Sequence, residues 1–131
     1  MDYMEKVRKM RADKEVHYNC AQSVLLAFTQ QAGLTDEQGY RLAAHFGSGM
    51  RHGSTCGAVT GALMALGLMG YDEKAAAAIL RQMRESHGAL DCATLLKTAH
   101  EAGIPRKEHC DGLVFEMVQA VAKILEEDKQ G

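Results

Sequence analysis

Three features of the sequence predict an all-α fold in a single compact domain. The alternation of apolar and polar residues that is typical of strands is missing, and β-branched residues are few. Glycines recur at intervals at which short helices would end. A chain of 131 residues also has the length of one domain and can bury a core without disulfide bonds. We therefore expect one helical domain over residues 1–131, with about six or seven short helices around a central apolar helix rich in Gly and Ala.

The start and stop signals of these helices agree with one another. The expected stops are glycines, and all except the second precede an apolar residue, as in a left-handed C-cap: Gly33, Gly47, Gly70, Gly88 and Gly103. The expected starts are capping residues: Asn19, Thr35, Asp72 and Asp91. Thr35 and Gln38 also have the spacing of a capping box.

Two segments are predicted to form most of the core. Residues 56–69, CGAVTGALMALGLM, are apolar on all sides and rich in small side chains, so that neighbouring helices can approach closely. We expect this segment to be the central helix. The last helix, from about residue 108 to residue 127, has apolar residues recurring along one face. Pro105 precedes it, where a helix breaker does no harm.

Composition excludes several classes of partner. Lys and Arg number 15 against 17 for Asp and Glu, so the net charge of -2 gives no reason to expect a nucleic acid. The N-terminal segment MDYMEKVRKMRADKEV lacks the apolar run of a secretory signal, which leads us to expect a cytoplasmic location. The longest uncharged stretch, residues 53–71, contains Ser, Thr and glycines and is too weakly apolar for membrane insertion. Apolar faces on several short helices leave a homodimer open.

The candidate functional residues are four cysteines, because a reducing compartment makes permanent disulfides uncommon. Cys20 follows Asn19, Cys56 follows Ser54 and Thr55, and Cys92 follows Asp91. These three cysteines therefore occupy the first turn of a predicted helix, whereas Cys110 has no such signal. At a helix start, unpaired N–H groups and the helix dipole stabilise a thiolate, which lowers the pKa from about 8.5 toward or below neutrality. The alternative is that each cysteine is a small apolar residue of the core.

The spacing of the cysteines leaves three kinds of site open. There is no C-x-x-C and no C-x-x-C-H, so a thioredoxin-type motif, a zinc knuckle and haem attachment are all missing. Successive cysteines are 36, 36 and 18 positions apart, so each comes from a different helix. This arrangement favours an iron-sulfur cluster over exchange between pairs of thiols, which usually lie close in sequence. A zinc ion bound by four cysteines needs the same number of ligands as an iron-sulfur cluster, and it is the third alternative.

The loop before Cys56, GSGMRHGSTCG, is a candidate for contact with a cofactor. Its glycines let the backbone approach a ligand closely. His52 could bind a metal or donate to a sulfur, although a surface position is the simpler reading. A phosphate loop is the weaker alternative, because the Lys of its motif is missing and no strand precedes the loop. The sequence contains no Ser-His-Asp, H-E-x-x-H or dinucleotide motif. It therefore gives no indication of an enzyme with a small-molecule substrate of its own.

At the cysteines the chain resembles a family of redox-active proteins that is named for its signature C, GCAxxG, C and C. The resemblance covers almost the whole length and is carried by four segments: NCAQSVLLAF, STCGAVTGALMALGL, DCATLL and HCDGLV. The central segment reads CGAVTG, with Cys before Gly, where the family name has the reverse order.

The resemblance implies a bacterial redox protein with a defined set of functional residues. It implies that the catalytic and metal-binding set is Cys20, Cys56, Cys92 and Cys110. Gly57 and Gly61 would shape the start of the central helix beside a cofactor. Relatives that include the non-haem portion of a multi-centre cytochrome imply electron transfer, and hence a cluster, without haem in this chain. Neither the residues nor the resemblance indicates the redox partner protein.

Overall fold

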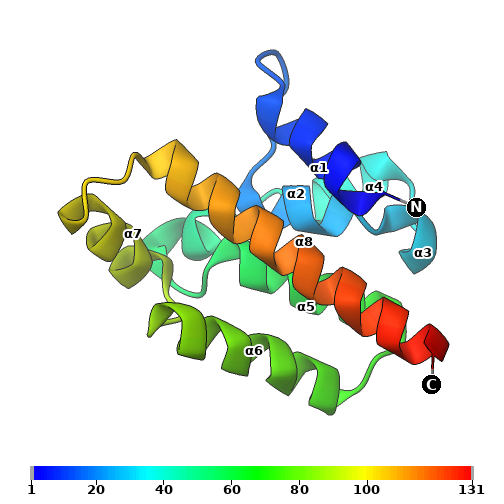
Figure 1. Ribbon diagram of the computed structural model, residues 1–131. Coiled ribbons are helices and arrows are strands. Elements are labelled where there is room, and N and C mark those ends of the chain that lie inside the picture. Colours follow the sequence, from blue (N-terminus) through cyan, green and yellow to red (C-terminus); the bar gives the residue numbers. More distant parts are fainter. Residues whose placement is uncertain (1, 131) are drawn as a thin grey trace.

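The structure is a computed structural model that describes residues 2–130, and within them it consists of helices without any strand. The elements are α1 (Tyr3–Ala12), α2 (Cys20–Leu26), α3 (Thr29–Ala32), α4 (Asp36–Leu42), η1 (Gly49–Gly53), α5 (Gly57–Leu68), α6 (Glu73–His87), α7 (Cys92–Glu101) and α8 (Arg106–Gln130). The predicted fold class, a single all-α domain, is confirmed (Figure 1).

The described chain has two more helical elements than we expected. The segment predicted as one helix between Asn19 and Gly33 is divided at Phe28, whose backbone leaves the helical region with φ -119° and ψ 10°. The Phe28 side chain is completely buried and its ring lies 4.6 Å from that of Tyr3. The second addition is η1, a tight turn within the glycine loop. The break at Phe28 and the turn of η1 both depend on contacts between residues that local sequence patterns do not predict.

The predicted caps are confirmed at nearly every position. The four predicted starts are N-caps whose side chains accept a hydrogen bond from a backbone N–H of the first turn. Four of the predicted stops have left-handed φ values from 74° to 84°: Gly33, Gly70, Gly88 and Gly103. The stop predicted at Gly47 is wrong, because α4 ends at Leu42. Gly47 instead passes so close to Asn19 that a Cβ on it would lie 2.5 Å from the Asn19 Cβ.

Helix α5 is the centre of the core, as predicted. It packs against α2, α6 and α8, and α8 crosses the molecule over α2 and α5 (Figure 1). Close approach to α2 depends on Gly61, where a Cβ would lie 2.6 Å from the carbonyl oxygen of Ala21. The small residues of α5 therefore set the distance between the two helices, which begin at neighbouring points.

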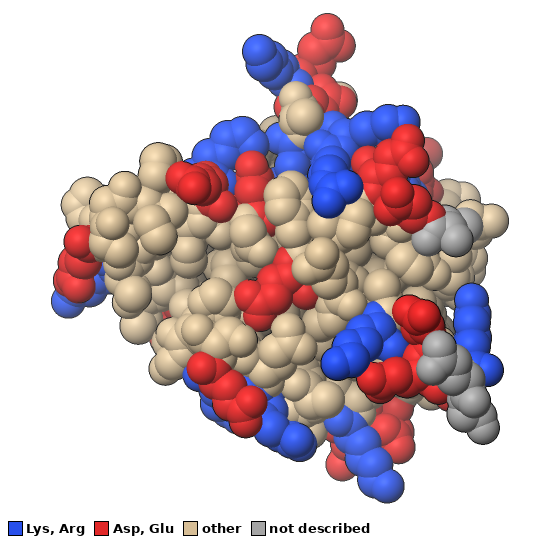
Figure 2. All heavy atoms as spheres, in the orientation of Figure 1, with Lys and Arg blue, Asp and Glu red and all other residues tan. Residues whose placement is uncertain are grey.

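The surface carries charges of both signs. On the face shown in Figure 2, acidic and basic side chains are mixed along the upper and lower edges, and the area between them is mostly uncharged. Within residues 2–130, no helix combines the length and the apolar character that a membrane span requires.

Candidate functional site

A cavity of about 390 Å³ brings the four cysteines together. All of them contribute to its lining: Cys20, Cys56, Cys92 and Cys110. The cavity lies where the start of α5 meets α1, α2, α7 and α8, and Leu95, Leu96 and Leu113 supply apolar walls. All four cysteines are free thiols, and Cys56 is the most deeply buried at 4% exposure. The fold therefore assembles a shared site from residues that the sequence keeps far apart.

Capping places two of the cysteines at the first residue of a helix. Cys20 begins α2 directly after Asn19, whose Oδ1 accepts the Gln22 N–H at 2.7 Å while Gln22 Oε1 accepts the Asn19 N–H at 2.8 Å. Cys92 begins α7 after Asp91, whose Oδ2 accepts the backbone N–H of Thr94 at 2.8 Å. These caps fix the direction in which each thiol leaves the backbone.

A single antiparallel bridge between Thr55 and Asp91 joins the starts of α5 and α7. The N–H of Cys56 donates to the Leu90 carbonyl at 2.8 Å, and the N–H of Cys92 donates to the Ser54 carbonyl at 2.7 Å. Cys56 is the N-cap residue of α5, so the three cysteines expected at helix starts are found there. The bridge holds Cys56 and Cys92 on the same side of the cavity.

Cys110 interacts directly with Cys20. It lies just beyond the first turn of α8, and its sulfur shares a hydrogen bond with the thiol of Cys20. The two residues are 90 positions apart in the sequence. The spacing gave no sign of this pair.

The hydrogen bond separates the acidities of the two thiols. Because Cys20 donates to the Cys110 sulfur, the bond lowers the pKa of Cys110 to about 6, against the effect of burial and with help from the charges of Arg106 and Arg11. The same bond, together with burial, raises the pKa of Cys20. The pair therefore combines a thiol whose pKa is raised, Cys20, with a thiol whose pKa is lowered, Cys110.

The prediction that thiols at helix starts have lowered pKa values is wrong for this site. Burial raises the pKa of Cys56, and the backbone N–H groups of Ala58 and Val59 that point at its sulfur only partly offset this effect. Burial also raises the pKa of Cys92, and the neighbouring Cys110 adds to the shift. Loss of hydration in the cavity outweighs the favourable field of the helix starts. The one thiol with a lowered pKa is Cys110, for which the sequence had no start signal.

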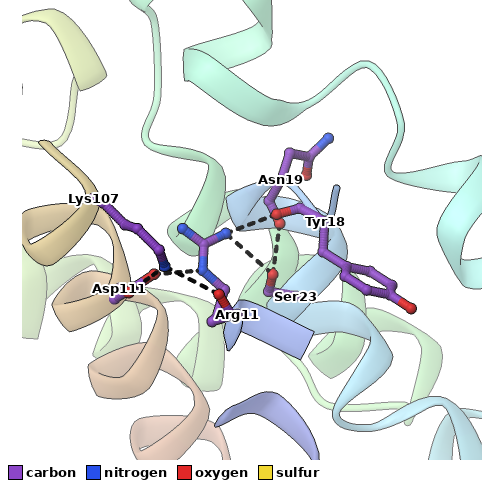
Figure 3. A network of polar contacts seen from close by, with 6 residues as sticks. All are labelled: Arg11, Tyr18, Asn19, Ser23, Lys107 and Asp111. Carbon is purple, nitrogen blue, oxygen red and sulfur yellow. Dashed lines mark hydrogen bonds and ion pairs between the residues drawn. The ribbon is translucent and has the colours of Figure 1, made fainter. Parts of the chain in front are cut away.

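Basic side chains that sequence reasoning missed line the same cavity. Arg11 of α1 donates from Nε to Asp111 at 2.7 Å and from Nη1 to the Tyr18 carbonyl at 2.8 Å (Figure 3). Lys107 donates to the same carboxylate at 2.9 Å, so the two cations share one anion. No sequence motif marks Arg11, because its place in the site depends on the packing of α1 against α8.

Arg106 is the second cation close to Cys110. Its guanidinium lies within hydrogen-bonding reach of the Cys110 sulfur, and its Nη2 donates to Ser48 Oγ at 3.4 Å. In the part of the chain that the structure describes, Arg106 has no carboxylate within 4.0 Å. Its charge is therefore offset only by the thiolate beside it.

The remaining predicted site residues take different positions. Gly57 lines the cavity, and a Cβ on it would lie 3.1 Å from the Cβ of Cys20. Gly61 faces α2 and does not line the cavity. His52 is exposed in η1 and is also outside the lining, so its role beside a cofactor stays a prediction. The loop is strained, since Ser48, Met50 and Arg51 all have positive φ.

The donors do not form a binding set for a single metal ion. Among residues 2–130, no three His, Cys, Asp or Glu side chains are close enough together to hold one. Zinc on these cysteines stays a prediction.

Comparison with known protein families shows which family the chain matches. A family model described as "Putative redox-active protein (C_GCAxxG_C_C)" matches residues 18–124, a range that contains all four cysteines. No curated protein and no solved structure matches this chain.

Proposed function

Because this chain belongs to the C_GCAxxG_C_C family of redox-active proteins, we propose that it is a thiol-disulfide redox protein whose reactive pair is Cys20 and Cys110. The observation that carries the proposal is that both thiols line the same cavity and lie close enough there to interact with each other. A thiolate beside a protonated thiol is the arrangement that two-step disulfide exchange needs, because one sulfur attacks first and the other resolves.

The reaction follows from the roles of the two sulfurs. The Cys110 thiolate attacks one sulfur of a substrate disulfide, which forms a mixed disulfide and releases the first substrate thiolate. Cys20 then gives up its proton and attacks the Cys110 sulfur. This step releases the second substrate thiolate and leaves a Cys20–Cys110 disulfide. Two electrons pass from the protein to the substrate, and the two substrate thiolates take up protons from Cys20 and from solvent. The reverse sequence oxidises a substrate dithiol.

The test is to identify the disulfide that forms. The reduced protein is treated anaerobically with a small disulfide, the remaining thiols are blocked, and the linked peptides are identified by mass spectrometry. We expect one link, between Cys20 and Cys110. Cys110→Ser should abolish the link, whereas Cys20→Ser should trap the mixed disulfide on Cys110. A link between any other two cysteines, or no reaction at a pH above 7, would contradict the proposal.

An iron-sulfur cluster is the second candidate, and one observation favours it. Four cysteines from four helices line one cavity of about 390 Å³, and such a cluster is held by cysteine thiolates. The residues that would hold it are Cys20, Cys56, Cys92 and Cys110, and the cluster would supply one-electron transfer. Anaerobic purification followed by iron and sulfide assays separates the candidates. Stoichiometric iron and sulfide, lost in Cys56→Ser, would replace dithiol exchange with a cluster, and metal-free protein with reactive thiols would remove the cluster.

A further inference from the structure

Resting on the proposed function, we infer that the substrate of Cys110 is a small disulfide that carries carboxylate groups. Three lining residues carry a positive charge: Arg11, Arg106 and Lys107. The same lining contains no Asp or Glu. A cavity with cations of this kind concentrates anions and repels cations.

The balance of charge at the cavity is positive after pairing is taken into account. Arg11 and Lys107 share the single carboxylate of Asp111, which leaves one positive charge between them. Arg106 adds another, because no carboxylate of the described residues lies within 4.0 Å of it. A negative charge on Cys110 would offset only one of the two. An incoming anion therefore still meets an excess of positive charge.

Arg106 is placed to orient such an anion. Its guanidinium touches the reactive sulfur and the hydroxyl of Ser48, and its charge also acts on the Cys92 thiol. Two contacts, one of them at 3.4 Å, leave further N–H groups of the guanidinium available for a ligand. A guanidinium binds a carboxylate through two parallel hydrogen bonds, which an ammonium group does not do. A carboxylate held there would lie beside the sulfur that attacks.

The size and walls of the cavity favour a small molecule. Its volume of about 390 Å³ is at the lower end of the range for small-molecule sites. Leu95, Leu96 and Leu113 can contact the aliphatic part of a ligand while the cations contact its charged end. Cys110 is only partly exposed, so a disulfide in a folded protein would have to reach into the cavity on a protruding loop.

The experiment compares three disulfides of similar size and different charge. They are 3,3′-dithiodipropionate with two negative charges, bis(2-hydroxyethyl) disulfide with none, and cystamine with two positive charges. The rate of oxidation of the Cys20–Cys110 pair is divided, for each disulfide, by its rate with free 1-thioglycerol, a neutral thiol that differs from the thiol of each probe, which removes differences in intrinsic reactivity. We expect the dianion to react about 10-fold faster than the neutral disulfide, and cystamine to react more slowly than either. The preference should shrink as salt is added.

Variants assign the preference to Arg106. Arg106→Gln should bring the ratio of the dianion to the neutral disulfide close to one, and Arg106→Lys should keep part of it. Lys123→Gln removes an exposed charge from the same helix 17 positions away, roughly 25 Å along α8, and should leave the ratio unchanged. Using the ratio separates the charge effect from any change in the reactivity of Cys110, and circular dichroism checks that each variant folds.

The outcomes distinguish the inference from the proposed function. If neither the three small disulfides nor a protein disulfide oxidises the pair, the proposed function fails. If all three react at equal normalised rates, the proposed function stands and the inference is wrong. The inference is also overturned if only a protein disulfide reacts, or if Lys123→Gln lowers the preference as much as Arg106→Gln.

Discussion

At the scale of single residues, reactivity in this site depends on which thiol receives a hydrogen bond. Cys20 and Cys110 are chemically identical, yet the donor keeps its proton and the acceptor loses it near pH 6. Position in a helix predicted the opposite ranking, since Cys20 begins a helix and Cys110 does not. Burial removes hydration from every thiolate in the cavity. The hydrogen bonds and charges next to each sulfur then decide which thiol has a lowered pKa.

The first prediction concerns the pH at which Cys110 reacts. Its alkylation rate by iodoacetamide should rise through a midpoint near pH 6 and level off above about pH 7, because only the thiolate reacts. Cys20→Ala removes the donor and should move the midpoint upward, toward the value of about 8.5 for an ordinary thiol. Cys20→Ser keeps a donor and should move it less. Mass spectrometry of the Cys110 peptide after timed alkylation provides the measurement, and an unchanged midpoint in Cys20→Ala would refute the assigned role of the bond.

The site was predictable in its cysteines but not in its charges. The four cysteines could be found because they are few and recur at helix starts. Arg11 could not be found, because it reaches the cavity only through α1, whose contact with α8 no local pattern encodes. The Cys20–Cys110 pair was missed for the same reason, since residues 90 positions apart become neighbours only in the folded chain.

At the scale of helices, boundaries were predictable wherever a side chain or a glycine acts on its own backbone. Asp72 and Asp91 cap the helices that follow them, and Gly88 ends α6 in a left-handed conformation, as their residue types indicate. The break at Phe28 and the turn of η1 were not predictable. The first coincides with burial of an aromatic ring and the second with a close approach of Gly49 to Ser54 and Cys92.

The second prediction compares two glycines of α5. Gly61→Ala should destabilise the protein by about 1–3 kcal/mol, because the new Cβ would lie 2.6 Å from the Ala21 carbonyl and would push α2 away. Gly67→Ala is the matched control on the same helix, with no atom within 4 Å of its new Cβ, and should be neutral or stabilising by up to about 1 kcal/mol. Urea unfolding gives both values. Equal effects of the two substitutions would show that α2 and α5 are not packed as described.

The third prediction compares two helix caps. Asp91→Ala and Asp72→Ala should each cost about 1 kcal/mol of stability, since each removes the side-chain acceptor of an N-cap. Only Asp91→Ala should change the alkylation rate of Cys92, because α7 begins at that cysteine whereas α6 begins outside the cavity. Thermal unfolding and peptide-resolved alkylation measure the two effects separately. An identical Cys92 rate in both variants would mean that the Asp91 cap does not position the thiol.

At the scale of the whole molecule, one ion-pair network fastens the N-terminal helix to the last one. The Arg11 and Asp111 side chains are 12% and 21% exposed and meet at 2.7 Å, and Lys107 contacts both residues (Figure 3). Burial raises the pKa of Asp111, but hydrogen bonds and charges from Lys107 and Arg11 outweigh it and lower the pKa overall. The network therefore stabilises the fold and holds two of the cavity's cations in place.

The fourth prediction is the effect of Asp111→Asn on stability and its dependence on pH. The variant should lose about 2 kcal/mol, because two charged hydrogen bonds are weakened. Since the folded pKa of Asp111 is lowered, the loss should be complete above about pH 4 and should shrink as pH falls through that pKa. Glu37→Gln, which breaks an exposed pair with Arg41, is the control and should change stability by no more than about 0.5 kcal/mol. A deficit that is independent of pH would contradict the ionic role.

The fifth prediction uses stability to identify the disulfide partner. A Cys20–Cys110 disulfide would join α2 to α8 across 90 positions, and closing a loop of that length in the unfolded chain should stabilise the oxidised protein by about 4–5 kcal/mol. A Cys92–Cys110 disulfide would close only 18 positions and stabilise by about 3 kcal/mol. Urea unfolding of oxidised and reduced protein measures the difference, and Cys20→Ser should abolish it. An oxidised form that is less stable than the reduced one would mean that the pair cannot form a disulfide without distorting the packing of α2 against α8. The redox change would then have to take place on other cysteines of the cavity.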